Sequence, residues 1–347
     1  MLRVSVVQGI DVEPVSEWLQ MHVAGATGPF AFAPMQGGHS NLAFTVTSAT
    51  GHRFVLRRPP LADAVAQAHD LSREYRIISA LRDSPVPVAT ARGYCADPLV
   101  NGAPFYVLDY VEGRVIRDRV SAKKLLSEPG RRRVSESFIN TMSAMHAVDL
   151  EASGLQDLGP HDNYMARQLR RWYRAWNLQK TRELPAVDHV HDALLSMIPP
   201  QVPATLVHSD LRLDNCLVDR RGDVVAVLDW EICAPGDPLA DLGLLMLFWS
   251  GPGEEPTAWS ATSTGVRGFL TRDAMVQRYA KTSGRDISRL DYYVAFAYWK
   301  HACILEGVYA QYVSGALGHR DDAELAGLKS QVEGAVAKAS ESLDRLA

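Results

Sequence analysis

The sequence predicts an α+β protein, in which a small part built on an antiparallel sheet and one main helix precedes a larger, mostly helical part. The first third of the chain reads as β-β-α-β-β, and the remainder has mainly helical periodicity. A single pair of β-prone runs returns within residues 205–231. The change in composition near Glu112 divides the chain into residues 1–111 and residues 112–347.

The first part begins with two β-prone runs, LAFTVTS and RFVLR, on either side of a turn-like break at residues 49–52. This pattern predicts an antiparallel hairpin. Residues 63–81 carry apolar side chains at helical spacing and end before the Ser-Pro-Val-Pro run of residues 84–87, which predicts the main helix. Two further β-prone runs follow, the second within residues 104–113.

The second part contains at least two amphipathic helices, one from Val134 to Met145 and one from Leu169 to Trp176. In the β-prone segment that follows, a turn at residues 220–223 separates two runs and predicts another hairpin. The polar residues that could carry chemistry converge on this hairpin.

The composition is that of a packed globular protein, with 347 residues, 47% hydrophobic and 22% charged. The net charge is −4 and the basic residues are dispersed, so we expect no nucleic-acid partner. The four cysteines stand far apart without a CxxC pair. This spacing argues against a disulfide framework and a thiolate zinc site, and it favours a reducing compartment.

The hydrophobic runs are short. The N-terminal segment reaches Asp11 and Glu13 after a brief apolar run and has no small-residue cleavage site, so it does not resemble an export signal. The longest apolar run, Leu242–Trp249, is far shorter than the ~20 residues that span a bilayer, and we expect it to be buried core. We therefore expect a cytoplasmic protein, monomeric or homodimeric, with no membrane partner.

The run from His208 to Asn215 has the spacing H-x-D-x-x-x-x-N, and Asp229 ends the next β-prone run. A loop of this kind can carry a base and a magnesium ligand, while the hairpin returns a second carboxylate. Magnesium prefers such oxygen ligands. Each carboxylate alone would be an ordinary turn or cap residue, and only their joint spacing with Asn215 favours a catalytic site.

These residues resemble the aminoglycoside phosphotransferase and choline kinase family, in particular the branch that is also found joined to acyl-CoA dehydrogenase-like domains. The resemblance covers nearly the whole chain and rests on GGHSNLAF, FVLRRPP, REYRIISAL, FYVLDYVEG, HSDLRLDN and LDWEICAPGDPLADLG, in the family's order. It implies a bilobal protein-kinase-like fold, with a nucleotide-binding N-lobe of residues 1–111 and a catalytic C-lobe of residues 112–347. It also implies a kinase that transfers the γ-phosphoryl group of ATP, or of GTP, through Mg²⁺ to a small molecule.

Carried over to this sequence, the resemblance implies that Asp210 orients or deprotonates the acceptor hydroxyl, and that Asn215 and Asp229 hold Mg²⁺. Arg57 stands where such kinases usually have a phosphate-binding lysine, with Glu74 as its partner. Arginine can bind phosphate bidentately, so this departure is chemically tolerable, although Arg58 remains an alternative.

The resemblance also indicates where the nucleotide binds. The glycine turn before the first hairpin would cover the phosphates, through Gly37, Gly38, Ser40 and Asn41. The interlobe hinge that meets the adenine edge would consist of Asp109, Tyr110 and Val111.

Several motifs are missing from the sequence, and their absence indicates that the acceptor is a small molecule. The sequence has no G-x-x-x-x-G-K-[ST] and no strand-associated G-x-G-x-x-G. Asp241 follows Asp229 closely and no Ala-Pro-Glu follows, which leaves little room for a peptide-docking activation segment. Aminoglycosides are polycations that favour acidic clefts, which this sequence does not obviously supply. The resemblance favours a hydroxyacyl compound or another hydroxylated metabolite instead.

Two other functions remain open. One is a nucleotide-binding pseudoenzyme with a scaffold or switch role, although the intact catalytic residues argue against it. The other is a zinc hydrolase, because His189, His191 and Asp192 lie close together, but a solvated helix surface is the more ordinary interpretation. We expect His208 and Asp241 to brace the fold, and we leave open whether Glu231 assists the metal.

Overall fold

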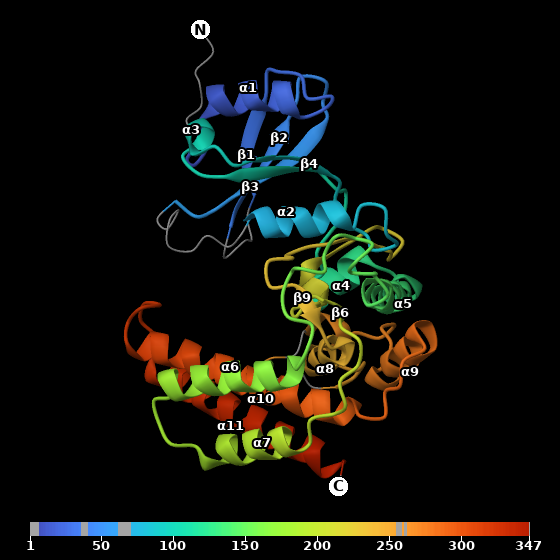
Figure 1. Ribbon diagram of the computed structural model, residues 1–347, viewed down its shortest axis with the longest axis vertical. Helices are drawn as coiled ribbons and strands as arrows, with labels where there is room; N and C mark the ends of the chain where they lie inside the picture. The colour runs from blue at the N-terminus through green and yellow to red at the C-terminus, as the bar shows by residue number, and fades with distance from the viewer. Residues whose placement is uncertain (1–6, 36–40, 62–70, 255–258, 260–261, 347) are drawn as a thin grey trace. The chain divides into compact units, whose positions relative to one another are not determined.

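The computed structural model describes residues 7–35, 41–61, 71–254, 259 and 262–346 (Figure 1). Its contacts divide the chain into two compact units. The first contains Met1–Arg114 together with Val224–Glu231, and the second contains Val115–Asp223 and Ile232–Ala347.

The first unit is built on an antiparallel sheet with strand order β1-β2-β3-β5-β4. The strands are β1 (Ala31–Pro34), β2 (Leu42–Thr47), β3 (Arg53–Arg58), β4 (Ala91–Cys95) and β5 (Phe105–Asp109). β2 pairs with β3 in the register Leu42↔Arg58, and the turn between them is closed by Ser48 N donating to His52 O at 2.9 Å. The predicted hairpin is confirmed.

Helix α1 (Val12–His22) packs on one face of this sheet. Val15, Trp18 and Leu19 recur at the i, i+3, i+4 spacing of an amphipathic helix, and all three are buried. The Trp18 ring meets the ring of Phe105 edge-on, with 4.9 Å between the centroids. α1 and the short α3 (Pro98–Asn101) are absent from the sequence-based prediction, although the spacing within α1 was readable.

Helix α2 (Leu71–Ala80) contacts β4 and β5 and includes the predicted main helix from residue 71 onward. Because side chains alternate along a strand, the residues between the core positions point away from α1. Tyr106 therefore faces α2, and its ring lies 6.0 Å from that of Tyr75. The same alternation directs Arg57 toward α2.

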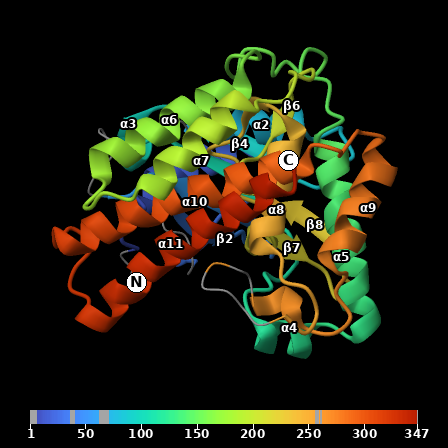
Figure 2. The ribbon, with the colours of Figure 1, turned by 90° about the horizontal axis from the view of Figure 1, so that it is seen from below.

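The second unit is mainly helical. Its helices are α4 (Arg119–Leu125), α5 (Glu128–Met145), α6 (Tyr164–Gln179), α7 (Pro185–Ser196), α8 (Pro238–Phe248), α9 (Arg272–Ser283), α10 (Leu290–Val313) and α11 (Asp322–Asp344). α5 and α9 lie side by side, and α10 packs against α6, α8 and α11 (Figure 2). Nearly every residue of α8 is buried, which confirms that the longest apolar run is core.

Short strands complete the fold. β6 (Thr205–Val207) pairs antiparallel with β9 (Ala234–Gly236). β7 (Cys216–Val218) and β8 (Val224–Val227) form another two-stranded sheet, which confirms the second predicted hairpin.

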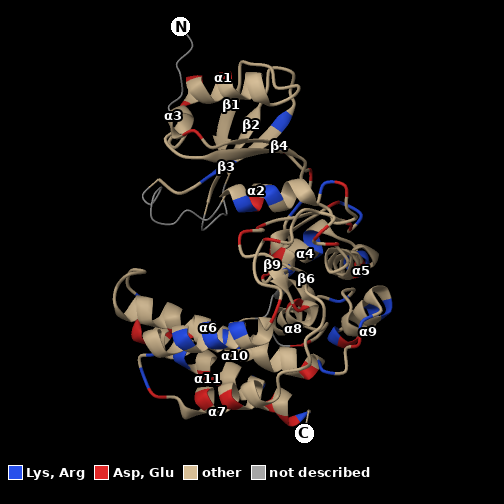
Figure 3. Cartoon of the chain, in the orientation of Figure 1, with Lys and Arg blue, Asp and Glu red and all other residues tan. Residues whose placement is uncertain are grey.

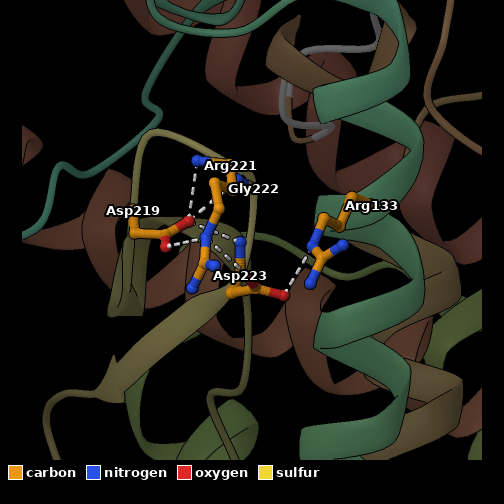
Figure 4. Close-up of polar contacts among 5 residues, drawn as sticks. All are labelled: Arg133, Asp219, Arg221, Gly222 and Asp223. Atoms are coloured by element: carbon orange, nitrogen blue, oxygen red, sulfur yellow. Dashed lines mark hydrogen bonds and ion pairs between the residues drawn. The ribbon is translucent and has the colours of Figure 1, made fainter.

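The turn after β7 is fixed by the carboxylate of Asp219 (Figure 4). Its Oδ1 accepts hydrogen bonds from the backbone N–H groups of Arg221, Gly222 and Asp223 at 2.8–2.9 Å. Burial opposes ionisation, but these hydrogen bonds outweigh it and lower the pKa of Asp219. Arg133 of α5 donates from Nε to Asp223 Oδ1 at 2.8 Å and thereby joins the turn to that helix.

Among the helices of the described residues, none combines the length and the apolar character needed to cross a lipid bilayer.

Candidate active site

The loop from His208 to Asn215, in the second unit, is held by a buried carboxylate on α8. Asp241 is 1% exposed, and its oxygens accept hydrogen bonds from the backbone N–H groups of His208 and Ser209, each at 2.8 Å. Burial disfavours the anion, but contacts with His146 and His208 outweigh it and lower the pKa of Asp241. Asp241 therefore braces the loop, and His208 is a fully buried part of the scaffold.

The start of the loop adopts an uncommon backbone conformation. Ser209 has φ 68°, and the structure shows only two other non-glycine residues with positive φ in the part of the chain that it describes, Asn163 and Asp229. Such conformations cost free energy and persist where surrounding contacts enforce them. The two N–H bonds to Asp241 provide that enforcement at Ser209.

The structure brings Asp210 and Asn215 together within the second unit. Asn215 Nδ2 donates to Asp210 Oδ2 at 2.9 Å and to the Asp210 carbonyl oxygen at 3.0 Å. This orients the carboxylate of Asp210 and leaves Asn215 Oδ1 as an oxygen available for a metal. Arg212 Nε lies 3.5 Å from Asp210 Oδ1.

In the first unit, Arg57 and Arg58 point to opposite faces of β3. Arg57 Nη1 donates to Glu74 Oε1 at 2.6 Å, and Glu74 is 1% exposed. Arg58 Nη1 instead donates to the carbonyl oxygens of Gly9 and Asn101, at 2.6 and 3.0 Å. Because these carbonyls occupy Arg58, we rank Arg57 as the phosphate-facing residue.

Asp229 lies in the same unit as Arg57 and within its electrostatic reach. Burial alone would lower the pKa of Arg57, but Tyr106, Glu74, Asp229 and Glu231 together raise it, so the guanidinium stays charged. Asp229 has φ 64°, and its buried Oδ1 has no hydrogen-bond partner among the described residues. A buried carboxylate oxygen without a partner is what a metal ligand would leave behind.

The residues fit a magnesium ion that is completed by other ligands. Within the described ranges, no group of three or more His, Cys, Asp and Glu side chains could hold a metal by itself. Magnesium usually takes one or two carboxylates and fills its remaining positions with phosphate oxygens and water. Asn215 Oδ1 in the second unit and Asp229 Oδ1 in the first unit are each an oxygen donor of the kind that magnesium prefers.

The predicted hinge residues already use part of their backbone. The N–H of Asp109 donates to Thr90 O at 2.9 Å, and that of Tyr110 donates to Arg53 O at 3.1 Å. The carboxylate of Asp109 pairs with the Arg92 guanidinium at 2.5 Å, so it is structural.

The glycine turn is only partly described. Gly37, Gly38 and Ser40 lie outside the described residues. Asn41 is 3% exposed, and in the segments that the structure describes neither its Nδ2 nor its Oδ1 has a hydrogen-bond partner.

Of the two histidines of α7, His189 is exposed and His191 is buried and packs against aromatic rings. The ring of His191 stacks on that of Tyr173 at 3.9 Å between centroids and lies 5.7 Å from that of Trp299. His191 Nδ1 lies 3.0 Å from the neighbouring Asp192 carboxylate. This geometry does not favour the zinc hydrolase.

The sequence-based prediction did not include two residues, one in each unit, that lie beside predicted site residues. Tyr106 stands beside the Arg57–Glu74 pair, and its phenol has a raised pKa chiefly because it is buried. Lys300 of α10 lines a cavity of about 10 Å³ with Ser209 and Asp241, which has room for about one water. Lys300 is an isolated charge in a run of aromatic and small residues, a signal that was present in the sequence.

A larger cavity, of about 480 Å³, is lined by none of the predicted site residues. Its lining consists of Arg119, Lys123, Glu128, Arg131, Gly265, Val266 and Arg267.

Several known proteins are similar to this chain in sequence. Residues 31–275 match the Phosphotransferase enzyme family. The chain is 32% identical over 295 residues to acyl-CoA dehydrogenase family member 10 of Mus musculus and 31% identical over 295 residues to family member 11 of Gallus gallus. These alignments cover 84% and 83% of this chain but 27% and 38% of the relatives, so the chain spans well under half of their length.

Solved structures share the fold. A protein from Ralstonia eutropha JMP134, provisionally named an aminoglycoside phosphotransferase, has a TM-score of 0.81 and 29% identity over 96% of this chain and 98% of its own. A thermostable mutant of aminoglycoside phosphotransferase APH(4)-Ia, in ternary complex with AMP-PNP and hygromycin B, has a TM-score of 0.62 at 17% identity. That comparison covers 93% of this chain and 98% of the other, and it shows likeness of fold.

The family match covers most of the chain, and the solved relatives confirm the kinase-like fold that the sequence predicted. The chain therefore belongs to the Phosphotransferase enzyme family.

Proposed function

We propose that this phosphotransferase moves the γ-phosphoryl group of ATP, through Mg²⁺, onto a hydroxyl of a small metabolite, with GTP as the alternative donor. Asp210 accepts the proton of the acceptor hydroxyl, whose oxygen then forms the new bond to phosphorus as the bond to the nucleoside diphosphate breaks. Residues 1–111 bind the nucleotide, and residues 112–347 supply the catalytic loop and bind the acceptor.

The observation that carries this proposal is the geometry of the catalytic loop. Two backbone bonds to Asp241 fix the start of the loop, and Asn215 holds the Asp210 carboxylate at 2.9 Å. A base that is already oriented avoids reorganisation during the reaction. The same hydrogen bond supports Asn215 as a metal ligand. Its amide nitrogen donates to Asp210, and its amide oxygen remains to coordinate the metal.

For the nucleotide, Arg57 would bind the phosphates while Glu74 keeps its guanidinium in place. Asn215 and Asp229 would hold Mg²⁺, which neutralises charge on the phosphates when bound. Gly37, Gly38, Ser40 and Asn41 would cover the phosphates. At the hinge, Asp109 and Tyr110 have committed their N–H groups, so the Val111 N–H would donate to the base.

The acceptor that we favour is a hydroxyacyl compound, with an aminoglycoside as the weaker candidate. The support is similarity to relatives named acyl-CoA dehydrogenase family members, of which the chain spans only part. A nucleotide-binding pseudoenzyme is the second function to keep. The alignment of Asp210 by Asn215 favours catalysis over it, because a scaffold would not need an oriented base.

A screen of hydroxylated metabolites with ATP and Mg²⁺ tests the proposal, with Asp210→Asn beside the wild type. We expect at least one acceptor to be phosphorylated, and Asp210→Asn to lower kcat by roughly 10²–10⁴-fold, the usual contribution of a general base. Asp273→Asn, an exposed carboxylate on α9, is the matched control and should retain full activity. Equal turnover by Asp210→Asn and the wild type would reject the base assignment.

A further inference from the structure

Cationic side chains gather beside the catalytic loop of the second unit. Arg212 belongs to the loop itself, and its guanidinium lies 5.1 Å from the centre of the Phe248 ring. The ammonium of Lys300 lies 5.3 Å from the centre of the Trp172 ring. Both charges act on His301, whose pKa falls to about 4 because of burial first and then because of Arg212 and Lys300. His301 is therefore neutral near pH 7. Arg212 lies 3.5 Å from Asp210 Oδ1 and 4.0 Å from Asp214 Oδ2, so part of its charge is balanced, whereas Lys300 has no such ion pair among the described residues.

Lys300 has no hydrogen bond or ion pair with any residue that the structure describes. Burial lowers the pKa of Lys300, and the nearby charge of Arg171 lowers it further. The carboxylates of Asp241 and Asp210 raise it, but by less. A half-buried ammonium group that donates no hydrogen bond costs free energy unless another group accepts one from it. A bound anion would do so.

Two further polar atoms beside these cations have no partner in the described part of the chain. They are His301 Nε2 and Trp259 Nε1, both buried. The rings of Trp259 and Phe248 lie 6.1 and 5.8 Å from that of His301, edge to face. The indole N–H can only donate a hydrogen bond, so its natural partner is also an acceptor atom.

The neighbouring helix extends the positive charge. α6 contacts α10, the helix that carries Lys300, and contains four arginines and no acidic residue. Three of them, Arg170, Arg171 and Arg174, are exposed and form no ion pair with the described residues. Figure 3 shows the basic segments along α6. An unbalanced basic surface attracts anions and repels polycations.

We propose that the acceptor carries a phosphate or carboxylate group, and that Lys300 and Arg212 bind this group beside Asp210 while α6 attracts the molecule. This inference rests on the proposed function and adds the chemical class of its substrate. Lys300 and Arg212 are then specificity-determining residues, because they discriminate between acceptors by charge. An aminoglycoside would bring its own positive charges to the same place.

The test measures equilibrium binding of probe pairs by calorimetry, with Mg²⁺ and AMP-PNP present so that the nucleotide site is filled. Glycerol 3-phosphate is compared with glycerol, 3-hydroxybutyrate with 1,3-butanediol, and kanamycin serves as the polycation. We expect at least one anionic probe to bind about tenfold or more tightly than its neutral partner, the effect of one charge-assisted hydrogen bond. The two pairs distinguish a phosphate from a carboxylate requirement.

Lys300→Met keeps much of the side-chain length without the charge and should abolish the preference for the anion, whereas Lys300→Arg should retain it. Lys281→Met, on the exposed surface of α9, is the matched control and should bind like the wild type. Rescue by arginine separates anion binding from a loss of packing, and melting temperatures identify a misfolded variant.

Three results would overturn the inference: equal or tighter binding of the neutral probes or kanamycin, no saturable binding of either anionic probe, or an unchanged preference in Lys300→Met. AMP-PNP binding is measured first in every sample. If AMP-PNP does not bind, the proposed function itself fails. If AMP-PNP binds without any charge preference among the probes, only this inference fails.

Discussion

Arg57 occupies a position where related kinases usually have lysine, and its surroundings explain why arginine works there. A guanidinium presents several donors in a fixed plane, so it can bind Glu74 at 2.6 Å through Nη1 and still offer its other N–H groups to a phosphate. It also remains charged when buried, as the raised pKa of Arg57 indicates. In the proposed nucleotide site, arginine could therefore take the place of that lysine.

The pair should also contribute to stability. Arg57→Met leaves the carboxylate of Glu74 buried without its partner, so we expect a loss of about 3–5 kcal/mol in the free energy of unfolding. Arg57→Lys keeps the charge and should lose much less. Urea denaturation of each variant checks this, with the exposed Arg82→Met as the control. Equal unfolding free energies for Arg57→Met and the wild type would mean that the buried ion pair does not form.

At the scale of elements, α8 positions the catalytic loop through two carboxylates one turn apart. Asp237 caps the helix by accepting from Leu239 N at 3.0 Å, and it also accepts from the hydroxyl of Tyr293 on α10 at 2.6 Å. Asp241 accepts the two N–H groups of the loop. Because α8 is buried on all sides, it fixes the position of the loop that carries Asp210.

The turn between β7 and β8 is packed closely against α5, and Gly222 makes this packing possible. Gly222 has φ +100°, and a Cβ there would lie 2.4 Å from the carbonyl oxygen of Gly130. Gly222→Ala should therefore cost more than the roughly 1 kcal/mol of an open left-handed glycine. Gly284→Ala, with φ +66° and open space around it, is the matched control. Thermal unfolding of both checks this, and equal losses would contradict the close approach.

How far the sequence predicts these elements depends on what each one requires. The hairpins and α6 follow from local alternation and periodicity, and α1 carries the same kind of signal in Val15, Trp18 and Leu19. The choice between Arg57 and Arg58 could not be made locally. It depends on the carbonyls of Gly9 and Asn101, which lie far from Arg58 in the sequence.

The site residues show the same contrast. The motif gave Asp210, Asn215 and Asp229 because their spacing is a local property of one hairpin. Lys300 reaches the neighbourhood of the loop through the packing of α10, and Trp259, which lies outside the helices, through ring contacts with Tyr298 and His301; no short motif encodes either placement. Val224–Glu231 likewise belongs to the first unit because of tertiary contacts. In one of them, Val227 N donates to Pro87 O at 2.8 Å.

In the whole molecule, the proposed site residues fall into two groups that belong to different units. Arg57, Glu74 and Asp229 lie in the first, and Asp210 and Asn215 lie in the second. Phosphoryl transfer depends mainly on positioning and charge neutralisation, so in the proposed reaction both groups would act on one nucleotide. The proposed activity therefore requires a shared divalent ion.

A crystal structure of the protein with AMP-PNP and Mn²⁺, which gives an anomalous signal in place of Mg²⁺, tests this requirement most directly. If the two residues share the ion, we expect an anomalous peak bound by Asn215 Oδ1, the Asp229 carboxylate and phosphate oxygens, at ligand distances close to the ~2.0–2.1 Å of Mg²⁺. A nucleotide bound without that peak, or a peak that contacts neither residue, would show that Asn215 and Asp229 do not share a divalent ion.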